Sequence, residues 1–169
     1  MMSSKVPLFT AAILVLAILS GGAQSPTSSS PAGNFNPMTM HHAKGTFEVT
    51  LKPVPLADAG ADNKLARMSI DKKFTGDLVG TSKGEMLSAG TDIKGSAGYV
   101  AIERVVGELA GRKGTFVMQH SGSMDRGVPQ LSVTVVPDSG TEGLAGIKGT
   151  LQIEIKEGKH FYDFEYSLP

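Results

Sequence analysis

The sequence predicts an all-β fold, an eight-stranded antiparallel β-barrel. Two observations carry this prediction. Apolar and polar residues alternate with period two in several short segments, and turn residues separate those segments. No segment of ten or more residues has the spacing of an amphipathic helix, and 21 glycines are spread along the chain. These features are typical of a closed barrel or a sandwich. We favour the barrel, because eight strands close well around an interior that holds side chains or one small ligand.

The alternation places the strands in order. In the first, Phe47, Val49 and Leu51 alternate with polar residues. Near the other end, Glu157-Gly158 fits a two-residue hairpin loop, because glycine readily adopts a positive φ. That loop sets Ile153 opposite Tyr162. Strands are expected near residues 46–52, 66–74, 76–88, 97–109, 114–122, 131–135, 150–156 and 159–168.

The N-terminus has the order of a secretory signal. Lys5 precedes an apolar run over residues 6–19, and small residues follow it. We therefore expect a signal peptide at 1–23, a disordered Ser/Pro-rich tether at 24–39 and the barrel domain at 40–169. The apolar run is shorter than the roughly 20 residues of a membrane helix. The expected location is periplasmic or extracellular, with no membrane contact after cleavage of the signal.

Composition narrows the class of partner. Sixteen acidic residues balance 16 basic ones, and without a basic cluster the sequence gives no reason to expect a nucleic-acid partner. The chain has no cysteine, so a hydrophobic core must supply its stability. His41 and His42 are expected in the tail, and they lack the ligand spacing of a metal site. We expect neither a metal nor a cofactor.

Glu103 and His120 form the best candidate pair for chemistry. A hairpin loop of two or four residues around Arg112-Lys113 pairs Val105 with His120, and Glu103 then lies two residues away on the same face. A three-residue loop would instead turn one of the two strands over and separate the pair. A carboxylate beside an imidazole in an apolar barrel shifts both pKa values and can serve as acid and base. The alternatives are a purely structural pair and an outward-facing Glu103.

Five other side chains are candidates to line a ligand site. Tyr99, Phe116 and Met118 share the predicted face with Glu103 and His120, and Tyr162 lies on the aromatic face of the last strand. Glu85 lies between small residues that would let a ligand approach. Structural roles remain open for each: tyrosines fill barrel cores, and Glu85 is equally compatible with an exposed position. The charged segment 71–77 around Gly76 suggests a structural turn.

The chain also resembles a known family. In five segments it is similar to the domain of unknown function 3224 family, and together these segments span nearly all of residues 40–169. The resemblance implies a fold like that of allene oxide cyclase and dirigent proteins, an eight-stranded antiparallel barrel with an internal cavity. It implies no activity, because sites rather than folds carry chemistry. The segments are Ala43–Val49, Arg67–Leu87, Gly95–Gly122, Val135–Gly146 and Gly158–Tyr162.

Three functions are compatible with these features. The favoured one is binding of a small, largely apolar molecule inside the barrel, with polar contacts from Glu85, Tyr99, Glu103 and His120. The second is an isomerase or cyclase that shapes a reactive substrate there. The third is a structural barrel filled by its own side chains. The sequence does not decide whether the protein is an enzyme, and it is compatible with a homo-oligomer.

Overall fold

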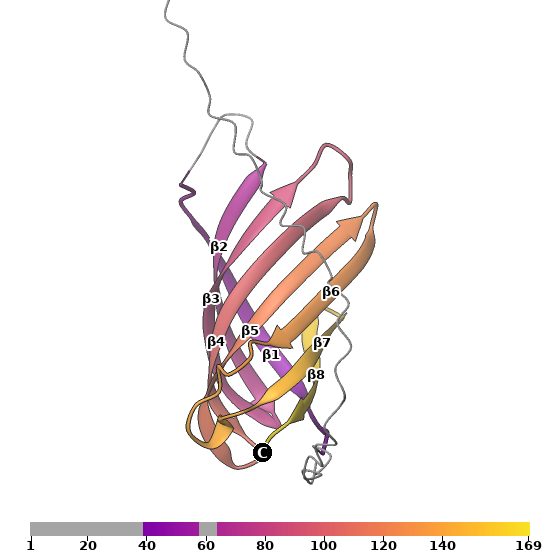
Figure 1. The fold of residues 1–169 in the computed structure, drawn as a ribbon. Helices are drawn as coiled ribbons and strands as arrows, with labels where there is room; N and C mark the ends of the chain where they lie inside the picture. The colour runs from indigo at the N-terminus through magenta and orange to yellow at the C-terminus, as the bar shows by residue number, and fades with distance from the viewer. Residues whose placement is uncertain (1–38, 58–63) are drawn as a thin grey trace, which may run out of the picture. The chain divides into compact units, whose positions relative to one another are not determined.

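The computed structural model describes residues 39–57 and 64–169, and it confirms the predicted eight-stranded antiparallel barrel. The strands follow one another around the barrel in sequence order, and β8 returns to pair with β1 (Figure 1). The predicted signal peptide and nearly all of the predicted tether lie outside the described residues. The strands are β1 (His41–Val54), β2 (Leu65–Gly76), β3 (Leu78–Gly90), β4 (Ala97–Leu109), β5 (Arg112–Asp125), β6 (Val128–Val135), β7 (Lys148–Lys156) and β8 (Lys159–Ser167).

A single short helical turn, the 3-10 element η1 (Glu142–Leu144), interrupts the strands of the described chain. It belongs to the connection between β6 and β7, which hydrogen-bonds along β5 through the amides of Val136 and Thr141. Leu144 and Ile147 of this connection are fully buried and plug one end of the barrel. In residues 39–57 and 64–169, no helix has the length and hydropathy to cross a membrane.

The β7–β8 hairpin has the predicted register. Its loop is Glu157-Gly158, and Ile153 lies opposite Tyr162. Both loop residues have a positive φ, 50° and 75°, as a two-residue hairpin turn requires.

The predicted register of β4 and β5 is wrong. The turn residues are Ala110 and Gly111, with φ of 52° and 75°, rather than residues around Arg112. Since the turn comes two residues earlier, His120 pairs with Ala101 and not with Val105. The change is an even number of positions, so each side chain keeps the face that the alternation assigned to it.

The barrel is complete around only part of its height. β8 pairs with β1 no further than Phe47–His160, and β6 pairs with β7 in register at Thr134–Thr150. Within the described chain, residues 48–54 of β1 and 128–133 of β6 therefore have a strand neighbour on one side only. Figure 1 shows β2 to β6 extending well beyond the short strands β7 and β8. We call the part enclosed by all eight strands the closed half and the remainder the open half.

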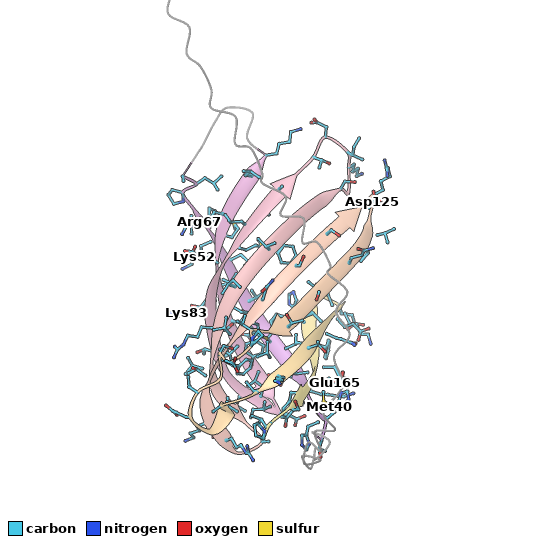
Figure 2. All side chains as sticks on the ribbon, in the orientation of Figure 1. Met40, Lys52, Arg67, Lys83, Asp125 and Glu165 are labelled. Atoms are coloured by element: carbon cyan, nitrogen blue, oxygen red, sulfur yellow. The ribbon has the colours of Figure 1, made fainter. Side chains whose placement is uncertain are left out.

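The hydrophobic core fills the closed half. Figure 2 shows side chains crowded around its lower part and sparser toward the β5–β6 turn beside Asp125, while Arg67, Lys52 and Lys83 lie along the outer wall. Phe116 stacks on Phe164 with ring centroids 5.7 Å apart, and both side chains are fully buried. The other members include Phe74, Leu78, Val105, Leu109, Met118, Val133, Val135, Leu151, Tyr162 and Tyr166.

The inner face of the open half is apolar but exposed. Leu51 and Leu131 share the face of the buried core residues on their strands, yet each is 44% exposed. Met124, on the same face of β5, is 42% exposed. These side chains point into the barrel and are not covered by the described part of the chain.

Candidate functional site

Four polar side chains meet inside the barrel at the level where the core ends. Glu103 Oε1 accepts hydrogen bonds from Lys72 Nζ at 2.7 Å and His120 Nε2 at 2.9 Å. Glu103 Oε2 accepts one from the Ser82 hydroxyl at 2.7 Å. The four residues are 0–6% exposed, with Glu103 the most deeply buried. We call Lys72, Ser82, Glu103 and His120 the buried polar cluster.

The strand registers explain why these residues converge. Lys72 of β2 lies opposite Ser82 of β3, and Gly84 of β3 lies opposite Glu103 of β4. A Cβ at Gly84 would lie 2.6 Å from the Cα of Glu103, so only glycine fits beside the carboxylate's own backbone. His120 pairs with Ala101, which makes it a diagonal neighbour of Glu103 across the β4–β5 pair.

Glu103 is held as a carboxylate. Burial by itself would raise its pKa, but the hydrogen bond from His120 and the charge and hydrogen bond of Lys72 act in the opposite direction, and Ser82 adds a third donor. Together they lower the pKa of Glu103 to about 2. With both oxygens engaged and a pKa this low, Glu103 is a weak base at neutral pH. It is better suited to orient Lys72 and His120.

Aromatic rings surround the cationic member of the cluster. The ammonium of Lys72 lies 4.8 Å from the ring centroid of Phe47 and 6.0 Å from that of Phe74. His160 stacks on Phe47 at 5.0 Å. A buried ammonium with a carboxylate partner and a ring face is electrostatically satisfied.

Tyr99 lies on the open side of the cluster. Its ring lies across Gly122 of the neighbouring strand, where a Cβ would come within 2.2 Å of a ring carbon. Burial, with the charge of Glu103, raises the pKa of the Tyr99 hydroxyl. No residue in the described part of the chain hydrogen-bonds to that hydroxyl. It is therefore available to a ligand in the open half.

The structure brings three of the predicted site residues together and separates the other four. Glu103, His120 and Tyr99 share the inner face at the base of the open half. Phe116 and Met118 are on the predicted face, but they pack in the closed half at 0% and 1% exposure. They lie beneath the cluster rather than along a surface that solvent reaches.

Tyr162 and Glu85 are not placed as a ligand site needs. The Tyr162 hydroxyl accepts from the Leu78 amide at 2.9 Å and donates to the Thr75 carbonyl at 3.2 Å, so it fastens β8 to the β2–β3 turn. The Glu85 side chain is 54% exposed on the outer wall and pairs with Arg67 at 2.6 Å. The expectation of an interior Glu85 is wrong, because its strand turns Ser82, Gly84 and Met86 inward.

Lys72 and Ser82 belong to the cluster but were not predicted as site residues. The charged segment 71–77 is not a turn as a whole: its turn is confined to Gly76-Asp77, and Lys72 lies within β2. The inward position of Lys72 could have been predicted, because it lies between Ile70 and Phe74 in a period-two pattern that assigns all three to one face. Ser82 carried no comparable signal, since a small residue is common on either face of a glycine-rich strand.

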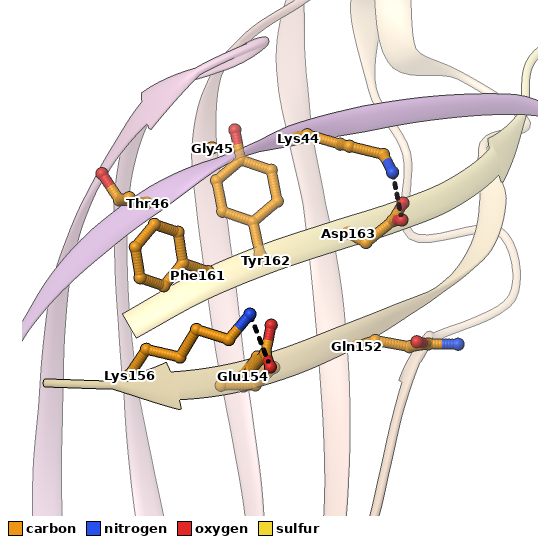
Figure 3. A pocket seen from close by; sticks show the side chains of 10 residues that line it. Lys44, Gly45, Thr46, Gln152, Glu154, Lys156, Phe161, Tyr162 and Asp163 are labelled. Atoms are coloured by element: carbon orange, nitrogen blue, oxygen red, sulfur yellow. Dashed lines mark ion pairs between the residues drawn. The ribbon is translucent and has the colours of Figure 1, made fainter. Parts of the chain in front are cut away.

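Two hollows lie along β1 and β8. Figure 3 shows the first, about 840 Å³ in volume, with the ion pairs Lys44–Asp163 and Lys156–Glu154 on it, each 2.9 Å long. The second, of about 600 Å³, is lined in part by His160. Exposed ion pairs of this kind contribute little binding energy, and neither hollow reaches the buried polar cluster.

The two histidines at the start of β1 are part of the barrel wall. His41 and His42 begin β1 instead of lying in a tail, and His42 Nδ1 is 2.8 Å from Asp163 Oδ1. Its hydrogen bond, with that of Lys44, lowers the pKa of Asp163. Across residues 39–57 and 64–169, no group of three or more metal-binding side chains is arranged to hold an ion.

Comparisons with known proteins agree on one family. Residues 43–166 match the family model described as a protein of unknown function, DUF3224. A solved structure of a DUF3224 protein of unknown function from Shewanella oneidensis MR-1 is 49% identical, with a TM-score of 0.73. The match covers 78% of this chain and 99% of that one. No curated protein matches significantly. The chain therefore belongs to the DUF3224 family, whose function is unknown.

Proposed function

We propose that the protein binds a small, largely apolar molecule against the inner face of the open half. One observation carries this proposal: apolar side chains line that face and remain exposed, although inward apolar residues in the closed half of the same strands are buried. Leu51, Met124 and Leu131 are 42–44% exposed. On the same three strands, Phe47, Phe116 and Val135 are at most 8% exposed. An uncovered apolar surface inside a protein is a feature of ligand sites.

The buried polar cluster supplies the base of this site. Its charges are matched, since the Lys72 ammonium faces the Glu103 carboxylate at 2.7 Å. A buried ion pair of this kind seldom stabilises a fold more than apolar residues of the same volume would. Its position next to the open half is therefore more readily explained by contact with a ligand than by stability. Of the residues at the base of the open half, Tyr99 and His120 are best placed to contact such a ligand.

An isomerase or cyclase with Glu103 as its acid or base has less support. The low pKa of that carboxylate, about 2, removes the proton that an acid needs and weakens the base. A barrel filled by its own side chains describes the closed half but leaves the exposed inner face of the open half unexplained.

A fluorescent apolar probe tests the proposal. N-phenyl-1-naphthylamine should bind the wild-type protein with an increase in fluorescence. Leu131→Glu places a charge on the inner face and should weaken binding at least about 10-fold, because an apolar ring must then desolvate a carboxylate. Gln130→Glu, one residue away on the outer face, should bind like wild type. Equal affinities for the two variants would contradict the proposed location. Independently of these variants, native mass spectrometry of the protein purified from its own host would identify a retained ligand.

A further inference from the structure

The second ring nitrogen of His120 has no hydrogen-bond partner among the described residues. Nε2 contacts Glu103 at 2.9 Å, and no bond to Nδ1 is present. Every side-chain nitrogen or oxygen that is truly buried in the described chain does have a partner. Nδ1 must therefore touch accessible space, although His120 as a whole is only 3% exposed.

Glu103 determines which nitrogen carries the hydrogen. An ionised carboxylate only accepts hydrogen bonds, so the Nε2 position of His120 is the donor in this contact. In the neutral imidazole a hydrogen on Nε2 leaves a lone pair on Nδ1. Lys72 already supplies the positive charge that balances Glu103, and the imidazole need only donate. In the neutral imidazole, the contact with Glu103 thus leaves Nδ1 as the hydrogen-bond acceptor.

The free nitrogen is approached from the open half. On the closed side, Met118 and its cross-strand partner Val135 are 1% and 8% exposed, so the core blocks that direction. Across the strand pair His120 faces Ala101, and the next inward residue of β5 is Gly122. Neither has a side chain large enough to fill the space above the imidazole, and the Tyr99 ring, which lies across Gly122, borders that space. Beyond Gly122 the inner face is apolar, with Leu131 opposite it.

We infer that the ligand of the open half is an apolar molecule with a weakly acidic hydroxyl, a phenol or an enol, and that this hydroxyl donates to Nδ1 of His120. The inference rests on the proposed function and deepens it by naming the class of ligand. An apolar frame fits the walls, and an acidic hydroxyl forms the stronger hydrogen bond to a basic nitrogen. A ligand without a donor would cover Nδ1 and leave it unpaired, which lowers affinity.

A matched pair of ligands tests for the donor. 1-Naphthol and 1-methoxynaphthalene share one ring system and differ in whether the oxygen carries a hydrogen. In displacement of N-phenyl-1-naphthylamine, the wild-type protein should bind the naphthol about 10-fold more tightly than the ether, the ratio expected for one hydrogen bond to an otherwise unpaired buried group.

Two histidine variants locate the acceptor. His120→Gln keeps an N–H that can reach Glu103 but removes the nitrogen at the Nδ1 position, so the preference for the naphthol should disappear while affinity for the ether is kept. His160→Gln is the matched control: this half-buried inward histidine stacks on Phe47 at 5.0 Å and makes no contact with Glu103. It should keep the preference. Loss of preference in both variants would overturn the assignment to His120.

A measurement on the unaltered protein covers the case in which His120→Gln does not fold. In nitrogen-15 NMR of the histidine rings, the Nδ1 resonance of His120 should shift when 1-naphthol is added and stay unchanged with saturating 1-methoxynaphthalene. Equal affinity for the two ligands, or no shift with the naphthol bound, overturns the inference but leaves ligand binding intact. Failure of both ligands to displace the probe contradicts the proposed function itself.

Discussion

The closed and open halves of the barrel have similar apolar inward residues but bury them to different extents. Val135 and Leu131 lie on one face of β6, and their exposed fractions are 8% and 44%. On β1 the same contrast separates Phe47, at 5%, from Leu51, at 44%. On both strands the exposed residue lies beyond the last pair with the closing strand, which is β8 for β1 and β7 for β6. Packing accounts for the apolar residues of the closed half, but not for those of the open half.

The buried polar cluster lies at the boundary between these halves. It is dry enough to hold an ion pair and close enough to the open half for His120 and Tyr99 to meet a ligand. Below it, the core has no comparable group of charges among the described residues. The two halves therefore differ in chemistry as well as in packing. The closed half contains the apolar core that stabilises the fold, whereas polar atoms lie at the boundary.

The largest expected difference between the halves is in the cost of truncating an apolar side chain. Phe164→Ala removes a fully buried ring that stacks on Phe116 and Tyr166, and should lower the free energy of unfolding by about 3–5 kcal/mol. Leu131→Ala should cost less than about 1 kcal/mol, because the side chain is 44% exposed and leaves no cavity. Urea denaturation measures both. Equal costs would show that something covers the open half.

Where the alternation is clear, the face that each residue takes on its strand was predictable from the sequence, and these faces predicted the pair of Glu103 and His120. Period-two alternation assigns faces without needing the register, which is why Glu103 and His120 were expected together although the β4–β5 turn was placed two residues too late. The β7–β8 hairpin was predicted in register because glycine at 158 leaves few alternatives for a two-residue loop.

Three features could not be predicted from the sequence: the outward position of Glu85, the buried ion pair of Lys72 and the open half of the barrel. β3 turns glycines and serine inward, so its weak alternation gave no reason to place Glu85 outside. Lys72 was missed because an inward lysine needs a partner from another strand, and Glu103 is 31 residues away in the chain. The short reach of β7 and β8, which creates the open half, depends on the closure of the whole barrel.

Acid should lower the free energy of unfolding through Glu103, which lies at the boundary between the halves. The folded protein lowers the pKa of Glu103 from 4.5 to about 2, so the unfolded chain takes up this proton first as the pH falls. The stabilisation is complete above about pH 4.5 and is lost toward pH 2, by about 3 kcal/mol in total. Urea denaturation across this range should show the loss.

Two variants assign this acid effect to one carboxyl. Glu103→Gln should be less stable at neutral pH, since Lys72 loses its charged partner, and should show a flatter pH dependence. Glu85→Gln is the matched control on the outer wall, where the pair with Arg67 is exposed and contributes little. It should keep the wild-type pH dependence. An unchanged slope in Glu103→Gln would mean that other carboxyls carry the effect.

The smallest expected difference is between two inward tyrosines, one in each half. Tyr162→Phe leaves the buried Leu78 amide without its acceptor at 2.9 Å, and should cost about 1–3 kcal/mol of unfolding free energy. Tyr99→Phe should cost less than about 0.5 kcal/mol, because no described residue bonds to that hydroxyl and the ring still covers Gly122. Thermal and urea denaturation of both variants measure the contrast. A cost above about 1 kcal/mol for Tyr99→Phe would mean that the protein itself already uses the hydroxyl, which would remove it from the groups available to a ligand.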